Sequence, residues 1–309
     1  MKDQGPIADR SKILTEQANP ATEGLDMLST EEALASIQEQ DAQLHRAIAA
    51  ARQQIAQAID LIAERLAQGG RLMYIGAGTS GRLGVLDAVE CPPTFQSDAQ
   101  QVQGVLAGGE SAMFRSVEGA EDDAAAGAAE MVARAVGARD VVFGITAGGT
   151  TPYVHGALQQ AREVGAACVF FACVPFDQAP DQADVSIRVV TGPEALQGST
   201  RMKAGTATKL VLNSISTLVM AKLGKVYDNR MVDVNTTGNV KLLDRGIRLV
   251  MDLGEVARAE AEQALDTSKG SVKLAVLSLR SGLNFQEASE LLAACKGNLR
   301  QAMARADAQ

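Results

Sequence analysis

Residues 74–95 read YIGAGTSGRLGVLDAVECPPTF, and this stretch decides the fold. Gly76, Gly78 and Gly81 form the pattern G-x-G-x-x-G, directly after the apolar run Leu72 to Ile75 and before a segment with helical character. Such a pattern indicates a tight strand-to-helix turn, where a phosphate group can bind the free N–H groups of the helix. Because dinucleotides and smaller phosphates both use turns of this kind, the rest of the sequence has to decide between them.

The composition limits the class of protein. The chain has 309 residues, 46% of them apolar, which is enough for one large or two modest domains. The 29 Lys and Arg against 37 Asp and Glu give a net charge of −8, which disfavours nucleic acid and anionic membranes as partners. The N-terminus lacks the apolar core of a signal peptide, and the most apolar run, Ala166 to Phe176, is too short to span a bilayer. We therefore expect a soluble, cytoplasmic protein.

Metal-binding patterns are absent from the sequence. The two histidines, His45 and His155, lie far apart along the chain. The four cysteines do not have the spacing of a zinc site and are better interpreted as buried free thiols. We expect neither a metal nor a cofactor.

Strand and helix patterns alternate through the middle of the chain. Ser29 and Glu32 form a capping box before a helix, and a long amphipathic helix is predicted over about 41–67. Alternating strands and helices follow, including helices over about 80–90, 112–136 and 200–223, and this favours an α/β fold with a parallel sheet covered on both faces. The tail is expected to be helical, with three short helices from about 266.

Two observations favour a monophosphate over a dinucleotide. The second predicted strand ends at Leu106-Ala107-Gly108-Gly109, without the acidic residue that grips a ribose. Hydroxyl-rich turns recur at 141–154 and 198–209, and three helix N-termini of this kind can converge on one phosphate. Ordinary helix capping is the plain alternative for each turn. The candidate substrate-binding residues are Thr79, Ser80, Thr146, Thr151, Ser199, Thr200 and Lys203.

The motifs resemble a known family. The stretches GAGTSGR and TAGGTTPY resemble the sugar isomerase (SIS) domain, which binds phosphosugars. The longer stretches GAGTSGRLGVLDAVECPPTF, GVLAGGESAMFRSVEGAEDD, GSTRMKAGTATKLVLNSIST and MVDVNTTGNVKL resemble the N-acetylmuramic acid 6-phosphate etherases, over about residues 20–309. This resemblance implies an N-terminal arm with helices over 1–63, an SIS phosphosugar-binding domain over 64–227 and a C-terminal helical region over 228–309.

The resemblance also implies a reaction and an assembly. These etherases convert N-acetylmuramic acid 6-phosphate and water to N-acetylglucosamine 6-phosphate and D-lactate, in the recycling of bacterial cell-wall sugars, as homodimers without a cofactor. The long apolar helix predicted over 206–223 also favours a homodimer, with burial inside one chain as the alternative. A non-catalytic phosphosugar-sensing regulator and an aldose–ketose phosphate isomerase are the other functions considered.

Glu90 and Glu121 are the candidate catalytic residues. In the family the glutamate of the ECPPT motif is the proton donor and that of EGAED is the second acid/base residue, and these match Glu90 and Glu121. Without the resemblance, either glutamate could be a solvated helix-end residue. Glu118 and Asp122 are neighbours that could be confused with Glu121. Glu90 is expected to end its helix, just before Cys91-Pro92-Pro93.

One position departs from the family pattern. The second turn of SIS domains usually carries a serine where this chain has Gly148. Backbone N–H groups, Thr150 or the third turn would then have to replace the missing hydroxyl.

Overall fold

The computed structural model describes residues 10–238 and 240–308. The chain divides into two compact units, one formed by Met1–Ala88 with Val102–Ile215 and the other by Val89–Gln101 with Ser216–Gln309. Each unit is described by itself below.

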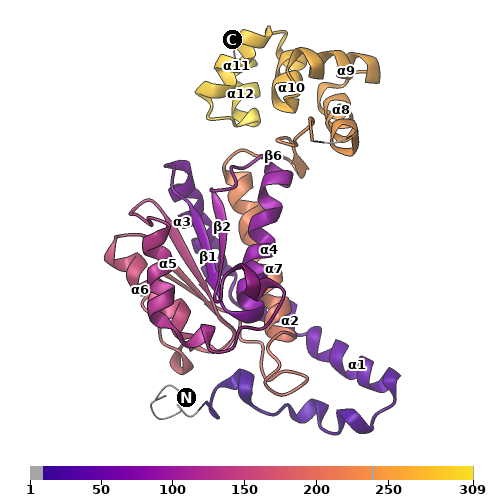
Figure 1. Cartoon of the computed structure of the whole chain (residues 1–309). Helices are drawn as coiled ribbons and strands as arrows, with labels where there is room; N and C mark the ends of the chain where they lie inside the picture. The colour runs from indigo at the N-terminus through magenta and orange to yellow at the C-terminus, as the bar shows by residue number, and fades with distance from the viewer. Residues whose placement is uncertain (1–9, 239, 309) are drawn as a thin grey trace. The chain divides into compact units, whose positions relative to one another are not determined.

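A five-stranded parallel sheet forms the centre of the first unit (Figure 1). Its strands are β1 (Leu72–Gly76), β2 (Val102–Leu106), β3 (Val141–Ile145), β4 (Ala167–Ala172) and β5 (Val185–Arg188). They lie in the order β2-β1-β3-β4-β5, and every neighbouring pair is parallel. The α/β fold with a parallel sheet predicted from the alternating pattern is confirmed.

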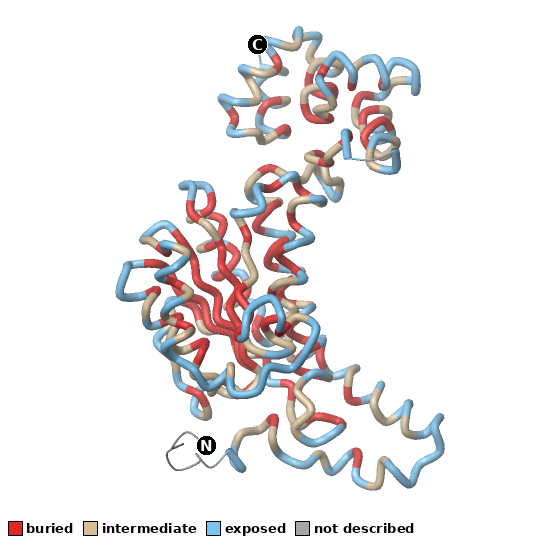
Figure 2. The backbone as a smooth tube through the Cα atoms, in the orientation of Figure 1, coloured by how far each residue is buried: buried red, intermediate tan, exposed pale blue. Residues whose placement is uncertain are grey.

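Helices cover both faces of this sheet, which is why β1, β3 and β4 are buried along their whole length (Figure 2). On one face, α5 (Ala124–Ala133) and α6 (Pro152–Glu163) pack against an apolar cluster that includes Met73, Val142 and Phe170. The opposite face is covered by the N-terminal parts of α4 (Gly78–Phe95) and α7 (Lys203–Lys222) (Figure 1).

The N-terminal segment contains three short 3₁₀ helices, η1 (Leu14–Glu16), η2 (Pro20–Thr22) and η3 (Leu25–Met27), before the α-helices begin. The predicted capping box is confirmed: Ser29 and Glu32 cap each other across the first turn of α1 (Thr30–Asp41). The single helix predicted over 41–67 is wrong, because it is divided into α2 (Leu44–Ala50) and α3 (Arg52–Ala67). The N–H groups of Gln43 and Ala51 bind carbonyl oxygens three residues earlier, and these tighter turns end α1 and α2.

The predicted helix over 112–136 is also wrong in its first half. Residues 107–123 form a loop with two 3₁₀ turns, η4 (Glu110–Met113) and η5 (Ala120–Asp122), and only α5 is α-helical. Arg82 explains the difference, because its guanidinium binds the carbonyl oxygens of Ala112, Met113 and Arg115. Gly119 has a left-handed backbone, with a φ of 74°, and this bend separates η5 from the earlier part of the loop.

Helix α4 is longer than predicted. It continues through Pro92 and Pro93 to Phe95, so Glu90 lies inside the helix and not at its end. The φ angle fixed by a proline ring is compatible with a helix, although each ring removes one N–H donor. The final turn closes with a hydrogen bond from Gln96 N to the Pro92 carbonyl.

The second unit begins with the C-terminal ends of α4 and α7. Its described residues also form a two-stranded hairpin, β6 (Val226–Tyr227) and β7 (Arg230–Met231), and five further helices. The helices are α8 (Val240–Gly254), α9 (Arg258–Thr267), α10 (Val272–Ser281), α11 (Phe285–Ala294) and α12 (Leu299–Ala306). They pack on an apolar core of their own. Ser271, Asn284 and Asn298 cap α10, α11 and α12, which are the three short helices expected for the tail.

All four cysteines are free and buried, as predicted. No helix in residues 10–238 or 240–308 has both the length and the apolar character that a membrane span requires.

Candidate active site

The strand order creates a crevice between β1 and β3. From β1 the chain crosses to β2 on one side, and from β3 it crosses to β4 on the other side. In parallel sheets ligands bind outside the carboxyl ends of the strands, at the point where the direction of the crossovers reverses. The turns that follow β1 and β3 flank this point, and they are two of the three turns with hydroxyl-rich motifs.

The first turn connects β1 to α4 with little space between strand and helix. A Cβ atom on Gly81 would lie 2.4 Å from the carbonyl oxygen of Gly76, so only glycine allows this approach. The turn therefore leaves Thr79 and Ser80 on the first turn of α4, where the N–H groups of a helix have no intrahelical partner.

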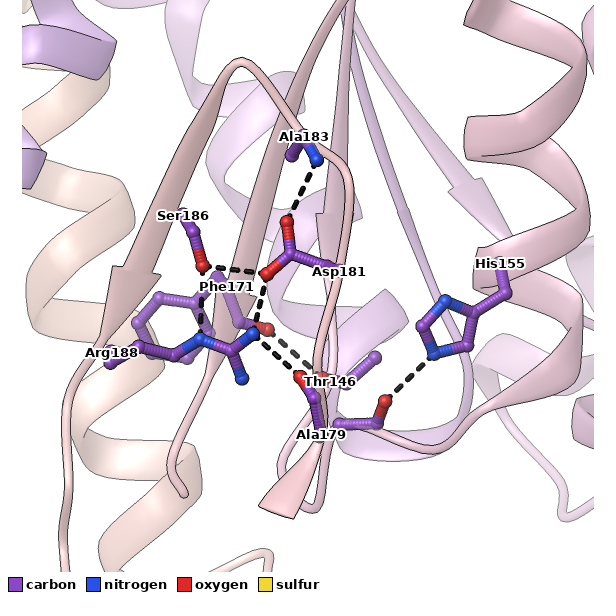
Figure 3. A network of polar contacts seen from close by, with 9 residues as sticks. Thr146, His155, Phe171, Ala179, Asp181, Ala183, Ser186 and Arg188 are labelled. Carbon is purple, nitrogen blue, oxygen red and sulfur yellow. Dashed lines mark hydrogen bonds and ion pairs between the residues drawn. The ribbon is translucent and has the colours of Figure 1, made fainter. Parts of the chain in front are cut away.

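The second turn, residues 146–151, is fixed from two sides (Figure 3). The hydroxyl of Thr146 donates a hydrogen bond of 2.9 Å to the Phe171 carbonyl, and His155 Nε2 lies 2.7 Å from the Gly149 carbonyl. Pro152 is the first residue of α6, a position that suits proline. These contacts hold the backbone of Gly148 and Thr150 in place at the sheet edge.

The third turn begins α7, and a buried glutamate caps this helix. The carboxylate of Glu194 accepts hydrogen bonds from the N–H groups of Lys203 and Ala204 at 2.7 and 2.9 Å. Burial raises the pKa of Glu194, although these hydrogen bonds and the charge of Lys203 oppose the change. Glu194 therefore occupies the cap of α7, while Ser199 and Thr200, just before the helix, line the pocket.

The three turns meet in one pocket of about 410 Å³, formed entirely by the first unit. It is lined by Arg10, Ile13, Glu16, Ala77, Gly78, Thr79, Ser80, Arg82, Glu121, Ala147, Gly148, Thr150, Thr151, Gly198, Ser199, Thr200 and Arg201. Three arginines, several hydroxyls and helix N-termini make this lining suitable for an anion. No group of three His, Cys, Asp or Glu residues placed to hold a metal ion occurs in the part of the chain that the structure describes.

Six of the nine predicted site residues line this pocket. They are Thr79, Ser80, Glu121, Thr151, Ser199 and Thr200. Thr146 and Lys203 are outside the lining and almost fully buried, at 1% exposure each. Thr146 binds Phe171 as described, whereas Lys203 Nζ lies 3.3 Å from Gln40 Oε1. Burial lowers the pKa of Lys203, and the charges of Glu194 and Asp41 oppose this.

Glu90 does not line the pocket either. It is exposed on α4, ten residues after Ser80, a separation of about 15 Å in an α-helix. The structure therefore brings Glu121, and not Glu90, to the pocket of its own chain.

The neighbours of Glu121 have other contacts. Glu118 accepts a hydrogen bond of 2.7 Å from the Ser116 hydroxyl, and Asp123 caps α5 through the N–H of Ala126. Asp122 is not among the lining residues. Of the acidic residues in this loop, only Glu121 reaches the pocket.

Sequence reasoning missed the contribution of the N-terminal segment. It assigns no site residue to the N-terminal arm, yet Arg10, Ile13 and Glu16 line the pocket. The only signal is the apolar pair Ile13-Leu14 between polar residues in Arg10-Ser-Lys-Ile-Leu-Thr-Glu16, which is too short to indicate where the segment lies. Arg82 was also missed, because a single basic residue in a helix has many possible roles.

Comparison with known proteins places this chain in a family. The model of the SIS domain matches residues 120–217, and that of the glucokinase regulatory protein N-terminal SIS domain matches residues 54–162. An N-acetylmuramic acid 6-phosphate etherase of Parasynechococcus marenigrum (strain WH8102) is 55% identical over 98% of this chain and 95% of its own length. The chain belongs to the N-acetylmuramic acid 6-phosphate etherase family.

A second etherase of this family, from Synechocystis sp. (strain ATCC 27184 / PCC 6803 / Kazusa), is 57% identical over 96% of this chain and 97% of its own length. Among solved structures, a phosphoheptose isomerase from Francisella tularensis has 17% identity and a TM-score of 0.46, covering 62% of this chain and 98% of that chain. The etherase family match extends over both units, so the C-terminal helices belong to the shared architecture.

Proposed function

We propose that this chain cleaves the D-lactyl ether of N-acetylmuramic acid 6-phosphate, giving N-acetylglucosamine 6-phosphate and D-lactate, in the recycling of cell-wall amino sugars. The observation that carries the proposal is the convergence of three hydroxyl-bearing turns and Glu121 on one pocket, in a chain of the etherase family. The turns offer helix N–H groups, hydroxyls and nearby arginines to a phosphate, and Glu121 offers a carboxylate beside it.

The chemistry requires acid and base catalysis. An ether oxygen is a poor leaving group unless it is protonated, and the C2 proton becomes acidic once the opened sugar ring presents an aldehyde at C1. A base removes the C2 proton, an acid protonates the C3 oxygen as lactate leaves, and water then adds to the double bond. Carboxylates can perform both roles when they are held near the reacting atoms. We assign the C2 base to Glu121 and the proton donor to Glu90.

The phosphate ligands in this proposal are Thr79 and Ser80 of the first turn, Thr151 of the second, and Ser199 and Thr200 of the third. Thr146 and Lys203 act behind the site, because their side chains bind Phe171 and Gln40 instead of lining the pocket. They support the second turn and the start of α7.

A homodimer is part of the proposal. The apolar face of α7 supports it less than the sequence indicates, because Val211, Leu212 and Ile215 are already buried within one chain. Stronger support comes from α4, where Leu86 and Val89 are 44% and 59% exposed beside Glu90. A second copy that covers this face would also shield Glu90 from water. We further propose the cytoplasm as the compartment, because four free thiols fit a reducing environment.

Incubation of the purified protein with N-acetylmuramic acid 6-phosphate tests the function. We expect equal amounts of D-lactate and N-acetylglucosamine 6-phosphate, measured by an enzymatic lactate assay and mass spectrometry. Tight binding of the phosphosugar without lactate release would contradict the enzyme and support the sensing regulator. Isomerisation of a ketose phosphate without lactate release would support the isomerase.

A further inference from the structure

Thr15 has a hydroxyl group with no partner. The residue is fully buried, and among the described residues no hydrogen-bond donor or acceptor contacts its Oγ1 atom. A buried hydroxyl without a partner costs about 1–3 kcal/mol, so native structures rarely keep one without a reason. Valine would fill the same volume without this penalty.

The segment that carries Thr15 is held in place on both sides of it. Leu14 N donates a hydrogen bond of 2.9 Å to Gln178 Oε1, and the Glu16 carbonyl accepts one of 3.0 Å from Gln197 Nε2. The loop that contains Gln178 is itself held by Arg188, which binds Asp181 and the Ala179 carbonyl (Figure 3). Thr15 therefore occupies a defined position against the body of the first unit.

That position faces the second turn of the candidate site. A Cβ atom built on Gly148 would lie 3.4 Å from Thr15 Oγ1 and 3.4 Å from Ile13 Cγ2. Gly148 lines the pocket, and so do Ile13 and Glu16, the residues on either side of the Leu14–Thr15 pair. The unpartnered hydroxyl thus lies in van der Waals contact with the place where a side chain at position 148 would begin.

Thr15 itself is fully buried and does not line the pocket. We propose that Thr15 completes the phosphate site, by donating its hydroxyl hydrogen to a phosphoryl oxygen once the bound sugar phosphate displaces the side chains that cover it. Gly148 leaves position 148 of the second turn without a side chain, and the N-terminal segment places a hydroxyl beside it from a distant part of the sequence. The inference rests on the proposed phosphosugar site and adds a ligand to it. It also accounts for the buried, unpartnered state of Thr15, since the ligand provides the missing acceptor.

Thr15→Val is the decisive variant, because it removes the hydroxyl and keeps the branched shape. Without ligand, the variant should melt at the same temperature as the parent or higher, since an unsatisfied buried hydroxyl has been removed. Its dissociation constant for N-acetylglucosamine 6-phosphate, measured by isothermal titration calorimetry, should rise between about tenfold and a hundredfold, the range for a hydrogen bond to a charged group. Thr15→Ser, which retains the hydroxyl, should bind nearly as well as the parent.

Gly148→Ser in the Thr15→Val background provides an independent readout. The new serine restores a hydroxyl beside the pocket, so the double variant should recover most of the lost affinity. A purely structural role for Thr15 predicts the opposite pattern: a lower melting temperature for Thr15→Val and no rescue by Gly148→Ser. That pattern, or unchanged affinity of Thr15→Val, overturns the inference.

Binding and turnover of the parent protein distinguish a failure of this inference from a failure of the proposed function. If the parent fails to bind N-acetylglucosamine 6-phosphate and releases no lactate, the proposed function is wrong. If the parent binds and turns over its substrate while Thr15→Val behaves identically, the function stands and only the role of Thr15 is wrong.

Discussion

Arg71 and Asp140 form a bidentate ion pair at the amino ends of β1 and β3. Asp140 Oδ2 accepts a hydrogen bond of 2.7 Å from Arg71 Nη2, and Oδ1 accepts bonds from Arg71 Nε and Arg71 N at 3.2 and 2.9 Å. Gly137 N adds a fourth bond of 3.0 Å. The pair ties the start of β1 to the loop before β3, on the edge of the sheet opposite the phosphate turns.

Asp140→Asn should reduce the free energy of unfolding at pH 7 by about 1–3 kcal/mol, because the half-buried donors of Arg71 and Gly137 lose their charged acceptor. Burial raises the pKa of Asp140. The hydrogen bonds from Arg71 and from the Gly137 N–H, together with the charge of Arg71, outweigh burial, so the pKa of Asp140 lies below its usual value. A carboxylate whose pKa is lowered by folding stabilises the folded protein at pH values above its pKa in the unfolded chain. This stabilisation is lost as the pH falls through its pKa in the folded protein. The difference between parent and variant should therefore shrink in acid.

Urea denaturation at pH 7 and at pH 3 measures this difference. Asp177→Asn, at an exposed position, is the matched control and should change the unfolding free energy little at either pH. A difference for Asp140→Asn that grows in acid would show that the ion pair does not stabilise the fold.

The thiols should be protected in the native protein. All four cysteines are at most 2% exposed, and burial raises the pKa of Cys168 to about 11 despite the nearby charge of Arg162. Since the thiolate is the reactive form, Ellman's reagent at pH 8 should modify the folded protein slowly and all four cysteines rapidly in guanidinium chloride. Rapid native labelling would show that one unit opens readily, and mass mapping would identify it.

The sequence predicts the parallel sheet well because buried strands and hydroxyl-rich turns are local patterns. Ser29 caps its helix as expected for the same reason. The loop before α5 could not be predicted, because Arg82 holds it through contacts about 30 residues away. Glu90 was placed at a helix end because prolines usually stop helices, whereas α4 continues through two of them.

The candidate site shows the same division between local and distant information. Thr79, Ser80 and Thr151 line the pocket, and each belongs to a strand-to-helix turn that its own motif predicts. Arg10 and Glu16 reach the pocket only through tertiary packing, which no nearby pattern encodes. The sequence does not distinguish Thr146 from the other threonines of its turn. Only the position of the Phe171 carbonyl decides that the Thr146 hydroxyl supports the turn.

Ser80→Ala should weaken phosphosugar binding about tenfold to a hundredfold, because a hydrogen bond to a charged group contributes about 1.5–3 kcal/mol. The unphosphorylated sugar should be a far poorer substrate of the parent, since phosphate binding helps to position the reacting atoms. Calorimetry and lactate release measure the two effects, with Ser36→Ala on α1 as the control. Comparable turnover of both sugars would contradict a phosphate-directed site.

A homodimer predicts a mass of twice 32.3 kDa by light scattering at micromolar concentration. If α4 forms the interface, Leu86→Glu should shift the mass toward that of one chain, because a charge would replace an apolar contact. Leu196→Glu, at a position 55% exposed outside α4, should leave the mass unchanged. A parent protein of single-chain mass would end the proposal.

Substitution of Glu90 and substitution of Glu121 should impair different steps of the reaction if the two residues have the roles proposed for them. Glu121→Gln removes the C2 base, so both lactate release and exchange of the C2 hydrogen in deuterated water should fall, by about 10²–10⁴-fold. Glu90→Gln removes the proton donor to the ether oxygen, so lactate release should fall by a similar factor. C2 exchange should then survive, because the aldehyde still stabilises the carbanion.

Glu118→Gln is the matched control for this pair, since Glu118 binds Ser116 and does not line the pocket. It should retain near-normal turnover and exchange. Exchange that survives in Glu121→Gln and is lost in Glu90→Gln would show that the two roles are reversed. Near-normal turnover in both variants would mean that Glu121 only lines the pocket and that Glu90 is a solvated residue of α4, and the elimination would then need another acid and base.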